Sequence, residues 1–457
     1  MKYISTRNTK ENFTFKEVFL RGLAPDGGLY IPKKFPIYSK NTLQDLKNLT
    51  YEEIATKIIF DFCSDDFKES EIEQIVKKSY KEFRTEEVVK IKKIGNLNLL
   101  ELFHGPTLAF KDIAMQVMGN IYERFLENQK KIKNIIVATS GDTGAAAISA
   151  LKGRKNLNIF VLHPHNRISK VQRKLMTTVK EKNVYNLAIK GNFDDCQNLV
   201  KAMFTDELFN KRVNMSGVNS INWARILVQV VYYFFSYFKI DSKKINYSVP
   251  TGNFGDVFSG YVAKKMGLPI QKLIIATNKN DILKRVIDTG KYKPKRVYHT
   301  ISPSMDIQLA SNFERLIFLI NSSNSKITLE KMKSLKNKNE FILSKSEINK
   351  IKRDFFAESL NEKETILVIN KMNKDFNILV DPHTAVGIGV LNKIKNEGAN
   401  VVLSTAHPSK FPDAIKKATN QNPELPLKFK KIMNMKENFK ILPNNLEELK
   451  KFIKDNI

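Results

Sequence analysis

The chain has 457 residues, of which 42% are hydrophobic and 10% aromatic. This composition excludes a disordered chain and is typical of a globular protein with two or three domains. The formal net charge of +29 would suit a polyanionic partner, but the lysines are spread along the chain without a basic tail or an Arg-aromatic motif. We therefore expect no nucleic-acid partner and only a general attraction for small anions.

The cysteines and the apolar segments indicate the cellular setting. Cys63 and Cys196 are far apart in the sequence, which predicts a reducing, cytoplasmic environment without disulfides. The first residues lack the apolar core of a signal peptide. The most apolar segment, 226–238, is interrupted by Gln229 and Ser236 and is too short to cross a bilayer. We therefore expect no membrane partner.

The pattern of the chain changes near residue 90. Before it, a turn at 24–28 and amphipathic helices near 42–60 and 69–83 are expected. After it, short apolar runs alternate with helical stretches, which predicts mainly parallel sheets covered by helices. The candidate strands are Leu97–Phe103, Asn134–Thr139, Leu157–Leu162, Val184–Ile189, Ile245–Val249, Lys272–Ala276 and Val401–Ser404.

These patterns divide the chain into three parts. We predict an N-terminal extension over 1–90, a small α/β domain over 91–215 and a large α/β domain over 216–457. The Lys/Asn/Ser-rich stretch 321–350 is predicted to be a surface insertion in the large domain. In open parallel sheets, ligands bind beyond the carboxyl ends of the strands. The loops between strands and helices are therefore the candidate sites.

The stretch 102–112 is the first of these loops, and it ends with Lys111. Apolar residues with helical spacing follow over 113–125, and Asp112 occupies the position of an N-cap for that helix. A helix N-terminus and apolar neighbours both lower the pKa of a lysine. Lys111 is therefore a candidate nucleophile for a Schiff base with an aldehyde cofactor or a carbonyl substrate. The alternative is an ordinary solvated lysine.

The strand at 134–139 leads into Ser140-Gly141-Asp142-Thr143-Gly144 and then into a helix of small residues. Glycines allow a close approach of the backbone, and the hydroxyls and amides at the helix start can hold an anion. A helix capped by Ser140 or Asp142 explains the same pattern equally well.

The strand at 245–249 leads into Pro250-Thr251-Gly252-Asn253-Phe254-Gly255-Asp256. The glycines before a helix N-terminus predict a phosphate cradle. The loop has neither the Gly-Lys-Ser/Thr ending of a Walker loop nor the glycine spacing of a dinucleotide site. A plain tight turn is the alternative.

Three further residues are candidates for chemistry. Thr405 offers a hydroxyl at the carboxyl end of the strand 401–404, whereas His407 is interpreted as a structural histidine. Arg225 could clamp a phosphate or carboxylate, and its alternative is a surface ion pair. The six histidines have no metal-ligand spacing, so no metal is expected.

A reactive lysine and a separate phosphate loop on a parallel α/β scaffold suggest pyridoxal 5′-phosphate (PLP). The ordered motifs His104–Asp112, Ser140–Gly144, Gly252–Asp256 and Thr405–Pro408 resemble those of the threonine synthase family. Segments 3–7, 22–30, 302–306 and 381–385 extend the resemblance to the longer members over essentially the whole chain. It implies a fold-type II PLP enzyme, similar to the tryptophan synthase β-subunit, with mainly parallel sheets in two cofactor-binding domains and an N-terminal extension.

The resemblance also implies roles for single residues. It makes Lys111 the catalytic Schiff-base lysine, places Asp142 near the ring oxygen of the cofactor, and sets Thr405 against the pyridine nitrogen. The cofactor phosphate is assigned to Gly252, Asn253, Phe254, Gly255 and Asp256. The substrate phosphate is assigned to Asn219, Ser220 and Arg225, with Thr139, Ser140 and Thr143 lining the same pocket.

The implied reaction converts O-phospho-L-homoserine and water to L-threonine and phosphate by β,γ-elimination and replacement, the last step of threonine biosynthesis. Lys111 would carry the protons. The implied enzyme is a lyase acting on a small molecule as a monomer or homodimer. Two alternatives stay open: a threonine-synthase-like phospholyase that yields 2-oxobutyrate, and a non-catalytic basic scaffold that binds nucleic acid.

Overall fold

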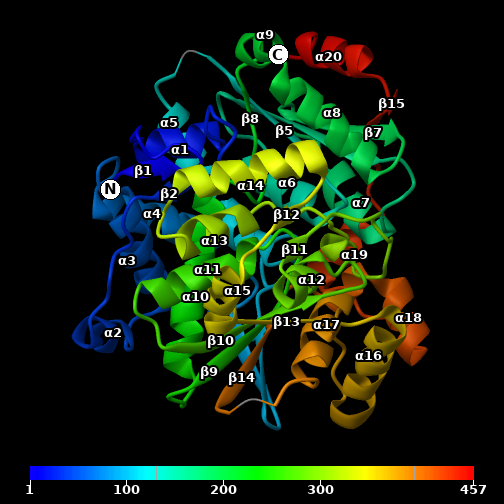
Figure 1. Cartoon of the computed structure of the whole chain (residues 1–457). Coiled ribbons are helices and arrows are strands. Elements are labelled where there is room, and N and C mark those ends of the chain that lie inside the picture. Colours follow the sequence, from blue (N-terminus) through cyan, green and yellow to red (C-terminus); the bar gives the residue numbers. More distant parts are fainter. Residues whose placement is uncertain (130, 396) are drawn as a thin grey trace.

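The computed structural model describes residues 1–129, 131–395 and 397–457. Two separate sheets with helices around them form its framework (Figure 1). A six-stranded sheet has the order β13-β10-β9-β14-β4-β3, and a five-stranded sheet has the order β15-β7-β6-β5-β8. Only β3 and β4 pair antiparallel among these described strands. The prediction of mainly parallel sheets is confirmed.

The strands fall at these positions. The six-stranded sheet contains β3 (Lys90–Ile94), β4 (Leu97–Glu101), β9 (Ile245–Pro250), β10 (Ile270–Thr277), β13 (Phe355–Ser359) and β14 (Ala399–Ser404). The five-stranded sheet contains β5 (Lys133–Ala138), β6 (Leu157–Pro164), β7 (Val184–Lys190), β8 (Met215–Ser216) and β15 (Lys440–Pro443). Two small antiparallel pairs are β1 (Tyr3–Ser5) with β2 (Tyr30–Pro32), and β11 (Lys291–Tyr292) with β12 (Phe341–Ile342). Every candidate strand has a counterpart here.

The helices lie between and around these strands. In the first half of the chain they are α1 (Phe15–Arg21), α2 (Lys40–Leu46), α3 (Tyr51–Cys63), α4 (Glu69–Tyr80), α5 (Lys111–Leu126), α6 (Asp142–Leu151), α7 (Lys170–Thr177), α8 (Phe193–Thr205), α9 (Glu207–Arg212) and α10 (Trp223–Lys239). In the second half they are α11 (Gly255–Lys265), α12 (Ile282–Thr289), α13 (Phe313–Ile320), α14 (Ser325–Lys338), α15 (Lys345–Asp354), α16 (Glu362–Phe376), α17 (Pro382–Leu391), α18 (Pro412–Thr419), α19 (Leu427–Ile432) and α20 (Leu446–Lys454). Two 3-10 turns, η1 (Pro303–Met305) and η2 (Pro408–Lys410), complete the set.

The segment 42–60, expected as one helix, contains two. Thr50 lies in an extended conformation and caps α3, with its hydroxyl accepting a hydrogen bond from the Glu53 N–H. The Glu53 carboxylate accepts in return from the Thr50 N–H at 2.8 Å. This reciprocal capping box ends any continuous helix at residue 50, so the prediction of one helix was wrong.

The sheets do not follow the order of the chain. β3 and β4, at the start of the predicted domain 91–215, belong with β14 to the six-stranded sheet. β15, near the end of the chain, pairs with β7 in the other sheet, and α20 lies beside α8 (Figure 1). The division at residues 91 and 216 therefore does not coincide with the division between the sheets.

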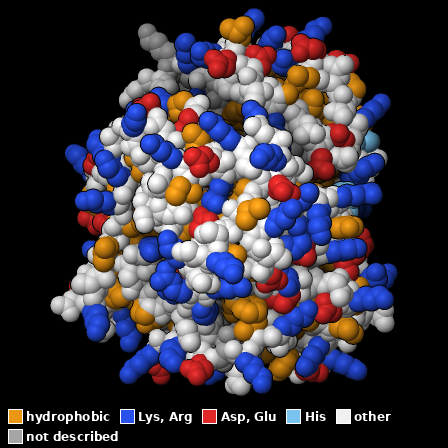
Figure 2. All heavy atoms as spheres, in the orientation of Figure 1, with side chains coloured by type: hydrophobic (Ala, Val, Ile, Leu, Met, Phe, Trp, Pro, Cys, Tyr) orange, Lys and Arg blue, Asp and Glu red, His pale blue; other side chains and the backbone are white. Residues whose placement is uncertain are grey.

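The stretch 321–350, which was predicted to lie on the surface, does so. Within the stretch 321–350, α14 buries only Thr328 and lies on the outside of the molecule (Figure 1). Lysine and arginine side chains are scattered over the face shown in Figure 2, with acidic side chains among them. No helix within the described ranges combines the length and the hydropathy of a membrane span.

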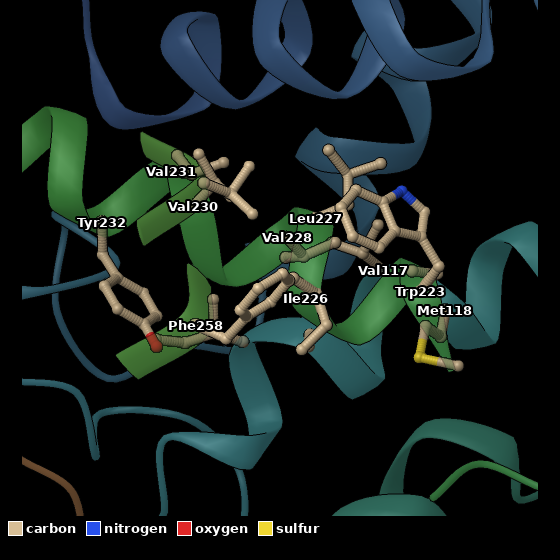
Figure 3. Packing of buried hydrophobic residues seen from close by; sticks show 14 of the residues in the cluster. Val117, Met118, Trp223, Ile226, Leu227, Val228, Val230, Val231, Tyr232 and Phe258 are labelled. Carbon is tan, nitrogen blue, oxygen red and sulfur yellow. The ribbon is translucent and has the colours of Figure 1, made fainter. Parts of the chain in front are cut away.

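Helix α10 is the centre of the largest hydrophobic cluster. All of its residues from Trp223 to Ser236 are buried, which explains the long apolar run in the sequence. Figure 3 shows Trp223 and Ile226 of α10 with Val117 and Met118 of α5 and with Phe258 of α11. Through this packing, α10 holds the middle of α5 and the first turn of α11.

Candidate active site

The carboxyl ends of three neighbouring strands meet at one place in the six-stranded sheet. β9, β14 and β4 lie side by side and parallel, so the loops that follow them emerge at the same edge. These loops carry Gly252, Thr405 and Lys111 respectively. The Phe110 N–H donates to the Thr405 carbonyl at 2.9 Å, which holds two of the loops together.

Lys111 is the first residue of α5 and is 8% exposed. Its Nζ donates to Asp142 Oδ2 at 3.3 Å, so the loop after β5 of the other sheet reaches the same place. Burial lowers the pKa of Lys111, Asp142 opposes this effect, and Lys410 and Arg225 reinforce it. The predicted lowering of the pKa is confirmed, with burial as the main cause.

Asp112 does not cap α5, contrary to the prediction. Phe110 is the N-cap and forms no side-chain capping bond. The Asp112 carboxylate instead accepts from the Thr107 N–H at 2.7 Å and from the Thr107 hydroxyl at 2.6 Å. Burial raises the pKa of Asp112 to about 6. The loop folds back so closely over the first turn of the helix that a Cβ on Gly105 would lie only 2.4 Å from the Asp112 Cβ. Only glycine fits at this position. Asp112 therefore closes the lysine loop.

The loop after β5 is organised around Asp142. The Thr139 hydroxyl shapes it by accepting from the N–H groups of Gly141 and Gly144, both at 2.9 Å. The Asp142 carboxylate is buried, and each of its two oxygens accepts from two side chains. Its Oδ1 accepts from Lys410 at 2.6 Å and from Gln172 at 2.9 Å, and its Oδ2 accepts from Lys111 at 3.3 Å and from Ser304 at 3.2 Å.

Asp142 is ionised in this setting. Burial alone would raise its pKa, but the ammonium groups of Lys410 and Lys111 hold the pKa well below its usual range. The carboxylate is therefore a permanent negative charge between two lysines.

The loop after β9 offers its backbone. Phe254 adopts a left-handed conformation with φ of 65°, and its ring packs in the core against Phe313 and Phe355. Helix α11 begins directly after it without a side-chain cap. The amides of its first turn have no acceptor inside the helix, so they can hold an anion. A Cβ on Gly252 would lie 2.6 Å from the Ser304 carbonyl oxygen, which explains the glycine.

Arg225 marks a second place for an anion. Its side chain is buried, burial lowers its pKa to about 10, and its Nε has no hydrogen-bond partner among the described residues. The neighbouring loop is fixed by Asn312, whose Nδ2 donates to the carbonyls of Ser220 and Asn253 at 3.1 Å each. The predicted substrate loop and the predicted cofactor loop are therefore adjacent.

The Asp256 carboxylate, assigned to the cofactor phosphate, is directed at α10. Both Tyr232 and Tyr233 donate their hydroxyls to its Oδ1. Burial raises the pKa of Asp256 to about 6. Two tyrosine hydroxyls and a raised pKa do not favour contact with a phosphate, so the amide of Asp256 is the better candidate for binding.

Several predicted side chains retain their hydrogen-bonding capacity. Within the described ranges, no hydrogen bond is formed by the side-chain polar atoms of Ser140, Thr143, Asn219, Ser220, Asn253 and Thr405. By contrast, Thr139 uses its hydroxyl to shape the loop after β5. The first group is therefore available to a ligand.

A cavity of about 400 Å³ reaches Ser140 and Gln172, two neighbours of Asp142. Ser140 and Gln172 line it on the side of the five-stranded sheet, and Pro303 and Asp306 line it on the other side. Gln172 lines the cavity and also donates to Asp142, so one side chain separates the cavity from the buried carboxylate.

The structure adds residues that sequence reasoning missed. Lys410 was not predicted, although a lysine beside the aromatic Phe411 directly after the Thr405 motif was a detectable signal. Segments 302–306 and 381–385 were noticed but received no role. They form a relay in which Asp381 Oδ1 lies 2.7 Å from His383 Nδ1, and His383 Nε2 accepts from the Ser304 N–H at 3.2 Å.

The residues present fit PLP. The Lys111 amine suits its aldehyde, and the uncapped start of α11 behind Gly252 suits its phosphate. Parallel sheets whose strand ends surround such a lysine define the fold-type II PLP enzymes. The family model "Pyridoxal-phosphate dependent enzyme" matches residues 92–406. The chain is thus an enzyme of the PLP-dependent class.

The more specific comparisons agree with one another. The family models "Threonine synthase N terminus" and "Threonine synthase, C-terminal" match residues 2–80 and 384–453. The chain is 40% identical to the threonine synthase of Pseudomonas aeruginosa, with 99% of this chain and 98% of that protein covered. It is 41% identical to the threonine synthase of Saccharomyces cerevisiae, with 98% and 96% covered.

The solved structures lead to the same family. The PLP-bound threonine synthase of Brucella melitensis superimposes with a TM-score of 0.96 at 43% identity, covering 100% of this chain and 99% of that one. The chain belongs to the threonine synthase family. It is therefore a lyase of threonine biosynthesis, as the resemblance implied.

Proposed function

We propose that this member of the family converts O-phospho-L-homoserine and water to L-threonine and phosphate, with Lys111 as the catalytic residue. The observation that carries the proposal is the presence of two separate anion sites beside one lysine. The start of α11 offers backbone amides, and Arg225 offers a buried guanidinium with an unpartnered Nε. A PLP enzyme whose substrate is itself a phosphate ester requires both.

The first site would hold the cofactor. The amides that follow Gly252, Asn253 and Phe254 would bind its phosphate, and Asp142 and Thr405 would face its ring. When bound, PLP withdraws electrons from the carbon next to the substrate amine and so makes its protons acidic. Thr405 contributes a neutral hydroxyl, which gives less stabilisation to a positive charge than a carboxylate would.

The second site would hold the substrate phosphate. Arg225 would bind it through its free Nε, and the side chains of Asn219 and Ser220 would donate to its other oxygens. Ser140, which also lines the cavity of about 400 Å³, and Thr143 would line the same pocket. A phosphate fixed in this way leaves from a defined position, and the water that enters can then add to one carbon only.

Lys111 would move the protons. Burial lowers the pKa of Lys111 and so favours the neutral amine; Nζ would accept a proton from the substrate α-carbon and, once it has passed that proton on, another from the β-carbon. Lys111 is the first residue of α5, and its hydrogen bond keeps Nζ beside Asp142. The negative charge of Asp142 favours the protonated amine after each transfer. The same Nζ would return the proton when water adds.

The setting of the protein belongs to the same proposal. We infer a cytoplasmic enzyme acting as a monomer or homodimer on a small-molecule substrate. The three-part division at residues 91 and 216 stays a prediction about segments of the sequence, since β3, β4 and β15 each belong to the sheet of the other part. Cys63 and Cys196 are both buried and unpaired, and burial raises the pKa of both thiols. Such thiols are compatible with a reducing compartment.

The test is product analysis of the PLP-loaded protein with O-phospho-L-homoserine. Phosphate, threonine and 2-oxobutyrate are followed in the same reaction. We expect equal amounts of phosphate and threonine. Phosphate accompanied by 2-oxobutyrate and little threonine would identify a phospholyase and contradict the proposed addition of water. Absence of turnover, together with salt-sensitive RNA binding, would indicate the non-catalytic scaffold.

A further inference from the structure

Lys410 is the most deeply buried cation beside the catalytic lysine. Its side chain is 0% exposed and lies in η2, the 3-10 turn that follows Thr405. Its Nζ contacts Asp142 Oδ1 at 2.6 Å and donates to the Thr107 carbonyl at 2.9 Å. A lysine with no exposure requires a charged partner and hydrogen bonds, and Lys410 has both.

Asp142 is shared unequally between its two lysines. The contact with Lys410 is 2.6 Å long, whereas the contact with Lys111 is 3.3 Å long. Because Coulomb attraction falls with distance, Lys410 is the stronger counter-ion of the carboxylate. The Oδ1 atom that it contacts is also bound by Gln172, and Lys111 contacts the other oxygen. The two lysines therefore have separate positions on one carboxylate.

We propose that Lys410 is a positioning residue of this reaction, which neutralises Asp142 so that Lys111 is not required as its counter-ion. Lys111 Nζ is then free to be neutral, to bond an aldehyde and to carry a proton. The inference rests on the proposed role of Lys111, and it adds a partner that sets the protonation of that lysine. Lys410 itself is held by Asp142 and the Thr107 carbonyl and does not act on the substrate.

The other charged groups around Lys111 are consistent with this division. The groups that face the pair of lysines are Asp142 of α6, Arg225 of α10, Asp256 of α11, Asp112 of α5 and His383 of α17. Arg225 acts on Lys111 in the same direction as Lys410, and both favour the neutral amine. Asp142 acts in the opposite direction. Lys410 touches that carboxylate directly, so its removal changes the balance most.

The test measures the protonation of Lys111 in the full chain stripped of cofactor. Trace labelling with acetic anhydride over a pH series gives the pH at which the Lys111 peptide reacts at half its maximal rate. In Lys410→Met, Lys111 becomes the remaining ammonium on Asp142, so we expect this pH to rise by about 1 unit or more. In Asp142→Asn it should fall.

A matched control separates this effect from the loss of any ion pair. Lys450 contacts Asp206 at 2.9 Å, between α20 and α9 on the far side of the five-stranded sheet. Lys450→Met removes a comparable ammonium and should leave the labelling of Lys111 unchanged. An equal shift in both variants would overturn the proposal, as would an unchanged Lys111 in Lys410→Met.

A double variant is needed if Lys410→Met does not fold because the Asp142 charge is left buried without its partner. Asp142→Asn/Lys410→Met removes both members of the pair, so no unpaired buried charge remains between them. Lys111 should react at higher pH in this double variant than in Asp142→Asn alone. In the PLP-loaded protein, the pH dependence of the visible absorbance should shift in the same direction. Identical titrations of the single and double variants would show that Lys410 has a structural role only.

Discussion

The two loops that precede α6 and α11 both end at an uncapped helix N-terminus, but only the first is occupied by groups of the protein itself. Both follow a buried parallel strand, and both start a helix without a side-chain cap. The loop after β5 is filled by the protein itself, since Asp142 binds Lys111 and Lys410, and Thr139 accepts from two amides of the loop. The loop after β9 leaves its helix amides free and has the buried Arg225 in its vicinity.

One pocket thus contains both a set of charges paired within the chain and a set of donors left for an anion. Charges that must keep a fixed value are paired inside the chain, where salt and ligand cannot screen them. Positions meant for a ligand keep donors without partners.

Replacing Lys111 breaks the loop after β5 at its reactive end. Lys111→Ala should lower kcat by roughly 10²- to 10⁴-fold, because the proton carrier is lost. Phosphate release from O-phospho-L-homoserine measures the loss, and an unchanged circular dichroism spectrum shows that the fold is retained. Lys93→Ala, at an exposed position of β3, is the control. Turnover close to that of the control would contradict the role of Lys111.

Replacing Arg225 removes the buried guanidinium near the loop after β9. Arg225→Met removes a buried guanidinium, and we expect kcat/KM to fall by about 10- to 100-fold through the loss of charge-assisted hydrogen bonds. The affinity for PLP, measured by fluorescence titration, should change much less. A large loss of PLP affinity with a normal KM would instead assign Arg225 to the cofactor phosphate. Arg225→Lys is the matched variant, since it retains the charge without the planar donor set.

The buried acid of α11 predicts a pH effect on stability. The folded-state pKa of Asp256 is raised to about 6, above the value of about 3.9 for an unfolded chain. Its contribution is therefore fully present below pH of about 4 and is lost as the pH rises through about 6. Asp256→Asn should gain about 1–3 kcal/mol relative to the parent between these two values.

Urea unfolding of the parent and Asp256→Asn at the two pH values measures this difference. The amide still accepts from Tyr232 and Tyr233, so the comparison isolates ionisation. Equal pH dependence of the two proteins would show that Asp256 has an ordinary pKa in the folded state.

The smallest effect concerns the glycines of the loop after β9. A Cβ at Gly252 would meet the Ser304 carbonyl at 2.6 Å, whereas a Cβ at Gly255 would meet its nearest atom at 3.4 Å. Gly252→Ala should therefore cost about 1–2 kcal/mol by overpacking, and Gly255→Ala should cost less. Thermal unfolding compares the two variants. The reverse order would show that η1 moves readily away from the loop.

Much of the scaffold could be predicted because its signals are local. The strands around Val137 and Val249 are continuous apolar runs followed by glycine loops, and both are strands. The pairing of strands could not be predicted, because β4 (Leu97–Glu101) pairs with β14 (Ala399–Ser404), which is far away in the sequence. Nothing in a local pattern identifies such a partner.

The site shows the same limit. Lys111 and the Gly252 loop have local signatures, a lysine before an apolar helix and glycines before a helix start. The misassigned Asp112 matched a capping pattern, but its carboxylate was taken by Thr107 when the loop folded back. The lysine at position 410 is visible beside Phe411 in the sequence, but its role could not be predicted, since that role depends on Asp142, which reaches it from the other sheet.

The position of β14 and β15 late in the chain has a consequence for synthesis. A nascent chain that has emerged as far as α13 already carries Lys111, Arg225 and both glycine loops. Yet the strand that separates β9 from β4 is still missing, and so is the edge strand beside β7. Unpaired strand edges invite pairing with other chains. The six-stranded sheet therefore cannot close until residues 399–404 have been made, and until then β9 and β4 expose strand edges that favour aggregation.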